Sequence, residues 1–227
     1  MTEGVLFDLD GTLADTAPDL AAAINRLRND HGLETIPLEQ LRPHVSSGAR
    51  GMLRAAFGLT PADEGYSDMA QRFLAHYAEH LCVDTRLFDG MPALLDALDG
   101  AGIPWGIVTN KQSRFTLPLV TALGLEKRAC CIVSGDSAAR PKPAPDPLLL
   151  GCSQAGISPR TCVYVGDDLR DVVAGKAAEM RTIAVAYGYL GVDDPIESWG
   201  ADAIIDTPAE LATLIGLEAC VRDSMGT

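Results

Sequence analysis

Two aspartates stand at alternate positions directly after the first apolar run of the chain, Val5-Leu6-Phe7. Residues i and i+2 of an extended strand point to the same side, so Asp8 and Asp10 share one face. Two carboxylates held side by side repel each other, and such a site normally holds a cation or shares a proton. An ordinary acidic turn would show the same pair, so the pair alone does not decide between a cation site and a turn.

Three further groups of polar residues occur along the chain. Two of them directly follow an apolar run, and the third lies in a proline-rich loop. Apolar runs at 103–108 and 162–165 read as strands, and alternating prolines at 141–147 permit neither a helix nor a strand ladder. Ligands of parallel α/β sheets bind outside the carboxyl ends of the strands, so these clusters are expected at one edge. The residues concerned are Thr109 and Asn110, Lys142, and Asp167 and Asp171.

The residue types at this edge suit phosphoryl transfer, which needs a nucleophile, a cation and a proton shuttle. A carboxylate can act as the nucleophile through an aspartyl-phosphate intermediate, and Asp8 is the candidate. Asp10 would protonate the leaving oxygen and later activate water. A carboxylate does not readily approach a phosphate dianion without a cation, and Mg²⁺ prefers oxygen ligands. The expected metal residues are Asp8, Asp10, Asp167 and Asp171, the last either as a ligand or one contact removed from the metal.

The segment Asp8-Leu9-Asp10-Gly11-Thr12-Leu13 resembles motif I of the haloacid dehalogenase superfamily. Motifs II, III and IV of that family resemble the clusters at Thr109, at Lys142 and at 166–171, in the same order. The resemblance implies that Asp8 is the nucleophile and Asp10 the acid/base. It also implies that Thr109 and Asn110 hold the phosphate and that Lys142 neutralises its charge.

Two residues beside these motifs are not expected to take part in the chemistry. Lys111 follows motif II without belonging to it, and we expect a solvated side chain. Asp168 lies between the two motif IV carboxylates and is expected only to cap the helix that follows.

The pattern of elements predicts how these clusters are positioned. Helical periodicity over 20–31, 37–45, 49–57 and 62–81 leaves no convincing strand between residues 16 and 86. Strands alternate with helices from there on, with strands expected at 103–108, 130–133, 162–165, 182–186 and 203–205. The prediction is a Rossmann-like, doubly wound α/β fold with a small all-α cap inserted after the first strand. Residues 1–15 and 87–220 would form the core, 16–86 the cap and 221–227 a flexible tail.

The cap offers candidates for substrate recognition. Ser47, Gly48 and Arg50 lie where a polar segment leads into a helix, a favourable place for an anion or a sugar hydroxyl. An exposed arginine at a helix start explains Arg50 equally well. The whole pattern resembles the phosphoglycolate phosphatase branch of the superfamily. The cap segment at 46–50 and the segments at 109–115, 187–189 and 199–202 also resemble phosphatases of N-acetylmuramic acid 6-phosphate, so the resemblance implies one of these two substrates.

Other functions fit less well. A dehalogenase would lack the second aspartate of motif I, so Asp10 argues against it. A sugar phosphomutase of the β-phosphoglucomutase type would keep all four motifs and stays open. An inactive phospho-ligand-binding module would commonly lose its nucleophile or lysine, whereas Asp8 and Lys142 are both present.

Charge and composition limit the possible partners. The formal net charge is −13, from 18 basic and 31 acidic residues, which argues against nucleic acid as a partner. No apolar run approaches the roughly 20 residues of a membrane span, and no signal peptide is recognisable. Six cysteines without a CxxC pattern favour a reduced, cytoplasmic protein. The expected partner is a small phosphorylated metabolite, and the sequence does not choose between a monomer and a homodimer.

Overall fold

A six-stranded parallel sheet forms the centre of the molecule, in a computed structural model that describes residues 2–191 and 194–217. Its strand order is β5-β4-β1-β6-β7-β8, so the first strand lies in the middle and the chain winds outward on both sides. This arrangement confirms the predicted doubly wound α/β fold. The strands are β1 (Gly4–Phe7), β4 (Trp105–Val108), β5 (Ile132–Val133), β6 (Cys162–Gly166), β7 (Arg181–Val185) and β8 (Ala203–Ile205).

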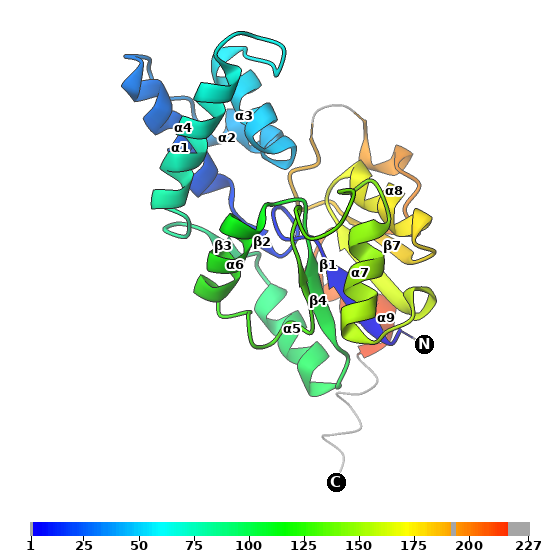
Figure 1. Ribbon diagram of the computed structural model, residues 1–227. Coiled ribbons are helices and arrows are strands. Elements are labelled where there is room, and N and C mark those ends of the chain that lie inside the picture. Colours follow the sequence, from blue (N-terminus) through cyan, green and yellow to red (C-terminus); the bar gives the residue numbers. More distant parts are fainter. Residues whose placement is uncertain (1, 192–193, 218–227) are drawn as a thin grey trace.

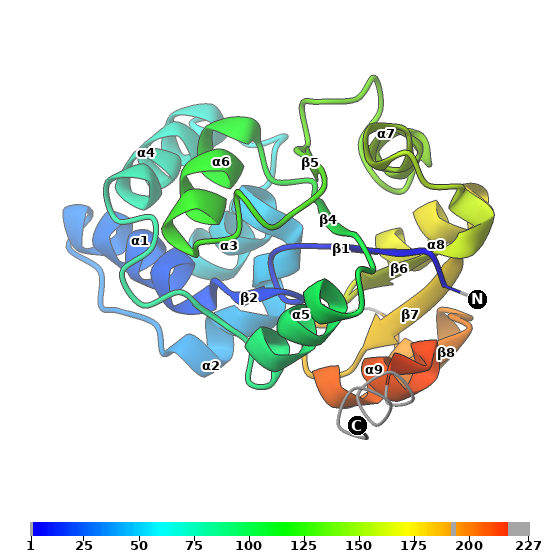
Figure 2. The same ribbon diagram turned by 90° about the horizontal axis from the view of Figure 1, so that it is seen from below.

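Helices cover both faces of the sheet, which explains why its strands are continuous apolar runs. Figure 2 shows α5 (Met91–Gly100) and α9 (Pro208–Ile215) on one face, and α7 (Asp146–Ala155) and α8 (Leu169–Ala177) on the other. Val5 and Phe7 of β1 are buried in the apolar cluster of the first face, and Leu6 is buried in that of the second. The sheet therefore has a core on each side and only its strand ends are free for chemistry.

A separate group of helices lies beside the carboxyl end of the sheet (Figure 1). It consists of α1 (Ala17–Asp30), α2 (Leu38–Leu41), α3 (Gly48–Phe57) and α4 (Tyr66–Glu79), which share an apolar cluster of their own. The chain enters this group through β2 (Ala14–Asp15) and leaves it through β3 (Arg86–Leu87), and the two strands pair antiparallel. The remaining helix, α6 (Ser113–Ala122), follows β4 and contributes to both the sheet core and the helical cluster.

Four expected elements are shorter than predicted, and one of them is the strand expected at 103–108, which is β4 and begins at Trp105. The helix expected at 37–45 is only α2, followed by a 3₁₀ turn over Arg42–Ser47, because Pro43 has no N–H for an α-helical bond. The helix expected at 62–81 starts at Tyr66, after Gly65 with its positive φ of 81°. The strand expected at 130–133 is reduced to β5. The predicted tail at 221–227 lies outside the described residues, and no described helix has the length and apolar character of a membrane span.

Asp19 in α1 fastens the returning chain to the helical group. Its buried carboxylate accepts hydrogen bonds from the N–H groups of Val83, Asp84 and Thr85, each at 3.0 Å, and from the Thr85 hydroxyl at 2.7 Å. These bonds fix the segment that leads directly into β3. One side chain thus sets the geometry of the connection between the helices and the sheet.

We expect Asp19→Ala to destabilise the protein strongly. The substitution leaves three N–H groups and a buried hydroxyl without their acceptor, at a cost of about 3 kcal/mol. Urea unfolding would measure the loss. Asp30→Ala is the matched control in the same helix, because the Asp30 carboxylate is exposed and pairs with Arg72 and His76 at the surface. A loss for Asp19→Ala no larger than for the control would contradict the anchoring role.

Candidate active site

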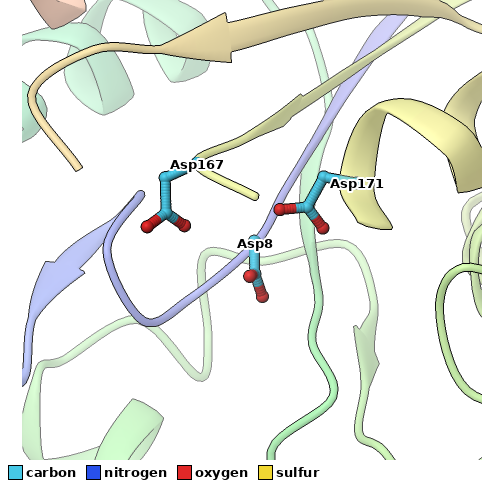
Figure 3. Close-up of side chains that lie close together, drawn as sticks. All are labelled: Asp8, Asp167 and Asp171. Atoms are coloured by element: carbon cyan, nitrogen blue, oxygen red, sulfur yellow. The ribbon is translucent and has the colours of Figure 1, made fainter. Parts of the chain in front are cut away.

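Three carboxylates meet at the carboxyl end of the sheet. Asp8 follows β1, Asp167 follows β6 and Asp171 lies in the first turn of α8, and one oxygen of each lies within 4.8 Å of the others. Figure 3 shows the three side chains gathered around a common centre. The sequence placed these residues at one sheet edge, and the structure brings all three together.

Asp167 is the most deeply buried of the three. Its carboxylate accepts hydrogen bonds from the Thr12 hydroxyl at 3.2 Å and from the Tyr189 N–H at 2.9 Å. Burial, followed by the charges of Asp8 and Asp171, raises the pKa of Asp167 well above its ordinary value. An ion of positive charge would relieve this repulsion, and carboxylate oxygens are the ligands that Mg²⁺ prefers. The residues present therefore fit a magnesium site.

A glycine allows the acidic turn to come this close to the cluster. Gly11 has a φ of 81°, and a Cβ atom at this position would lie 2.1 Å from an oxygen of Asp167. Any other residue would be strained and would displace the carboxylate. The geometry of the site therefore requires Gly11, although this residue has no side chain that could take part in a reaction.

Lys142 places a positive charge between two of the carboxylates. Its ammonium lies 2.7 Å from Asp171 and 3.1 Å from Asp8, and it also donates to the Tyr164 hydroxyl at 2.8 Å. Burial alone would lower its pKa, but the charges of Asp171 and Asp8 outweigh it and raise the pKa. Lys142 is therefore charged and fixed beside the Asp8 oxygen.

Asn110 and Thr109, which follow β4, make different hydrogen bonds. The Asn110 side chain accepts from the Lys142 N–H at 2.9 Å and donates to the Lys142 carbonyl at 2.9 Å. The Asn110 side-chain amide thus positions the lysine loop, and the expected binding of phosphate by this residue stays a prediction. The Thr109 hydroxyl accepts from the Lys111 N–H at 3.2 Å, and its own proton has no acceptor among the described residues.

Asp10 does not join the cluster with its side chain, although it was expected among the metal ligands. Its carboxylate accepts from the Thr16 hydroxyl at 2.6 Å and pairs with the Lys111 ammonium at 2.9 and 3.2 Å. The same ammonium lies 4.6 Å from the ring centre of Tyr77 in α4. The expectation of a solvated Lys111 is wrong, since only 8% of its side chain is exposed.

Asp168 caps α8, as expected, and also holds an arginine. Its carboxylate accepts from the Arg170 N–H at 2.8 Å, while Asp171 accepts from the Asp168 N–H at 3.2 Å, which completes a capping box. The Arg170 guanidinium pairs with the same Asp168 carboxylate and donates to the Ser46 carbonyl of the helical group at 2.6 Å. Sequence reasoning missed Arg170, because motif IV drew attention only to its carboxylates.

A cavity of about 300 Å³ opens onto the cluster between the sheet edge and the helical group. Its floor is polar, with Asp8, Asp10 and the residues after β4, and its far wall is apolar. Ser47 and Gly48 line it as expected. Arg50, the other predicted cap residue, is exposed and does not line it. The apolar wall consists of Leu20, Val45, Phe73, Leu74, Tyr77 and Phe115.

Known proteins resemble this chain over nearly its whole length. A family model described as haloacid dehalogenase-like hydrolase matches residues 5–185. An N-acetylmuramic acid 6-phosphate phosphatase of Pseudomonas aeruginosa is 45% identical over 218 residues, with 96% of each chain covered. A phosphoglycolate phosphatase of Xanthomonas campestris pv. campestris is 44% identical over 208 residues, which cover 91% of this chain and 93% of the relative. The crystal structure of a predicted phosphoglycolate phosphatase from Haemophilus somnus has a TM-score of 0.82 at 28% identity, covering 94% of this chain and 97% of the other.

Proposed function

This chain belongs to the family of haloacid dehalogenase-like hydrolases, and we propose that it hydrolyses a small phosphomonoester through an aspartyl phosphate on Asp8. It is a phosphatase of that family. The observation that carries the proposed mechanism is the position of the Asp8 carboxylate. One of its oxygens lies 3.1 Å from the charged Lys142, at the floor of the cavity and beside Asp167 and Asp171.

The proposed reaction has two steps. In the first, an Asp8 oxygen attacks phosphorus, the bond from phosphorus to the substrate oxygen breaks, and Asp10 gives that oxygen a proton. In the second, water attacks the same phosphorus, its proton passes to Asp10, and the Asp8 carboxylate leaves. Lys142 stays beside Asp8 in both steps, and the free proton of the Thr109 hydroxyl points to a role in holding the phosphate.

The Lys111 ammonium pairs with the same Asp10 carboxylate that has to give a proton in the first step and take one in the second. The first step needs the protonated form, so the ion pair between Lys111 and Asp10 must loosen when the substrate is bound. The substrate phosphate, a second anion near this ammonium, would compete with Asp10 for it.

Mg²⁺ is the cofactor that we propose, held by Asp8, Asp167 and Asp171. When bound, it supplies the positive charge that lets a phosphate dianion approach a carboxylate. Asp171 Oδ1 already has Lys142 and the Tyr164 hydroxyl as partners, whereas Oδ2 accepts from the Asp168 N–H and keeps a second lone pair for a metal or its water.

The helical group over residues 16–86 is proposed to act as a cap over this site. It supplies the apolar wall of the cavity and touches the cluster, since the Ser46 hydroxyl lies 3.4 Å from Asp167. A cap that closes during the first step would exclude water until the aspartyl phosphate has formed. Residues 15–16 and 87–90 comprise the last residue of each strand of the two-stranded ribbon and the residues that follow it, and they are the proposed hinges.

The proposed substrates are N-acetylmuramic acid 6-phosphate and, second, 2-phosphoglycolate, after the relatives of similar sequence. The apolar wall favours the larger sugar, whose substituents could cover it.

We place the reaction in the cytoplasm, where the free thiols found at five described cysteines persist.

Phosphate release measured with both substrates at matched concentrations tests this proposal. We expect release that requires Mg²⁺, stops with EDTA and is faster with the sugar phosphate. Faster release from 2-phosphoglycolate would overturn the order of substrates. Release from p-nitrophenyl phosphate alone would refute both substrates while leaving the chemistry in place, and undiminished release in EDTA would refute the metal site.

A further inference from the structure

Arg170 lies on the wall of the cavity, between the carboxylate cluster and the helical group. It lines the cavity together with Ser46, Ser47 and Gly48. Asp8 and Asp171 line the same cavity, so a group bound to the Arg170 guanidinium lies in the cavity onto which the carboxylate cluster opens. The N-terminal end of α3, which carries a partial positive charge, belongs to the same wall.

The Arg170 side chain is fixed in one orientation. Its Nε and Nη2 atoms each donate to Asp168 at 2.8 Å, and Nη2 also donates to the Ser46 carbonyl. Asp168 is itself immobilised as the cap of α8. A fixed guanidinium loses little side-chain entropy when it binds a ligand. Nη1 has no hydrogen-bond partner among residues 2–191 and 194–217, so two N–H donors are left.

The other cations that line the cavity are already committed. Lys142 pairs with Asp8 and Asp171, and Lys111 pairs with Asp10. Their side chains are 2% and 8% exposed, whereas 34% of the Arg170 side chain is exposed. Among the described residues that line the cavity, Arg170 is therefore the cation with donors left for a group other than the phosphate.

We infer that Arg170 binds a carboxylate of the substrate, and that the substrates of this enzyme are phosphomonoesters that also carry a carboxylate. This inference rests on the proposed function and narrows it to a chemical class. The free Nη1 atom offers two N–H donors of a charged group, and a carboxylate oxygen is the acceptor with which such donors form their strongest hydrogen bonds. The acidic character of the protein makes such a direct contact necessary, because a net charge of −13 repels a second anionic group. Both substrates named for the relatives, muramic acid and glycolate derivatives, are acids of this class.

Matched substrate pairs test the inference. N-acetylmuramic acid 6-phosphate differs from N-acetylglucosamine 6-phosphate by a lactyl ether with its carboxylate, and 2-phosphoglycolate differs from ethyl phosphate in the same sense. We expect Arg170→Gln to lower kcat/KM about 10- to 100-fold for the acid of each active pair, the range of a charged hydrogen bond. The neutral partner should change by less than about threefold. Arg54→Gln, an exposed arginine of α3, is the matched control and should change neither.

The outcomes separate the possible roles of Arg170. Equal losses on both members of a pair would mean that Arg170 holds the phosphate or the cap, and would overturn the inference. Loss of the preference in Arg50→Gln but not in Arg170→Gln would also overturn it. If Arg170→Gln does not fold, Arg170→Lys takes its place, and it should lose activity on the acid alone. No phosphate release by the wild type from any of these substrates would instead refute the proposed function.

Discussion

Asp8→Asn is expected to abolish turnover, with a fall in kcat on the order of 10⁴-fold or more. The amide has nearly the same shape as the carboxylate, but it is neutral and a far weaker nucleophile at phosphorus. Without it the aspartyl phosphate cannot form, and the neighbouring Lys142 and Asp10 have no step to assist. Phosphate release with Mg²⁺ measures the effect, and activity within tenfold of the wild type would exclude Asp8 as the nucleophile.

Thermal unfolding separates this loss from a loss of the fold. The Asp8 carboxylate lies close to the carboxylates of Asp167 and Asp171, so removing its charge reduces the repulsion among them when no metal is bound. In EDTA the melting temperature of Asp8→Asn should therefore equal or exceed that of the wild type. The rise on adding Mg²⁺ should be smaller, because one ligand is lost.

Asp10→Asn is the control for that measurement. The Asp10 side chain lies outside the carboxylate cluster and pairs with Lys111. Asp10→Asn should lose turnover, because the group that gives and takes the proton is gone, but it should keep the full Mg²⁺-dependent rise in melting temperature. A diminished rise in Asp10→Asn would instead place its carboxylate among the metal ligands, as the sequence alone suggested.

The meeting of Asp8, Asp167 and Asp171 was predictable because it follows from topology. Each residue stands at or just beyond the end of an apolar strand, and parallel strands bring their carboxyl ends to the same edge. The order and direction of the strands are enough to predict that the three aspartates meet, without any interatomic distance. The same argument placed Thr109 correctly, since β4 pairs directly with β1.

Partnerships across the chain were not predictable. Lys111 stands 101 positions from Asp10, and its other neighbour, Tyr77, belongs to the helical group. Nothing in the local sequence distinguishes this lysine from a solvated one. Asn110 likewise resembles a ligand in sequence, and only the paired bonds to the Lys142 backbone reveal its positioning role.

Tyr189 shows the same limit at the hinge. Its hydroxyl donates to Asp15 at 3.0 Å and accepts from the Thr16 N–H at 2.7 Å, while its own N–H donates to Asp167. Arg42 of the helical group stacks over its ring and pairs with Asp15. One residue thus contacts both the carboxylate cluster, through its backbone N–H, and the hinge, through its hydroxyl, and the local sequence pattern predicts neither contact.

Lys142→Met is expected to cost both activity and stability. The lysine is buried between Asp8 and Asp171, and removing one partner of a buried charge group costs about 3–5 kcal/mol. For a protein of this size that is a fall in melting temperature of roughly 10 °C in EDTA. Lys127→Met removes the same charge from an exposed position and is the control, with little expected change.

The pH dependence of that loss identifies its cause. Burial already raises the pKa of Asp171 in the wild type, and Lys142 opposes the rise. Without Lys142 the folded-state pKa of Asp171 rises further above the unfolded value, so the folded state binds the extra proton. Stability of the variant should then fall as pH rises from about 4 toward 8, and the deficit against the wild type should shrink on acidification.

A double variant decides whether charge compensation is the reason. Lys142→Met/Asp171→Asn removes the ammonium and the carboxylate that lies 2.7 Å from it, so the buried charge left unpaired by the single change is gone. Stability in EDTA should recover by a large part of the loss, because the two changes are strongly coupled. Activity should stay lost, since Asp8 still lacks its cation. Additive losses of stability in the double variant would show that Lys142 stabilises the site by packing rather than by charge.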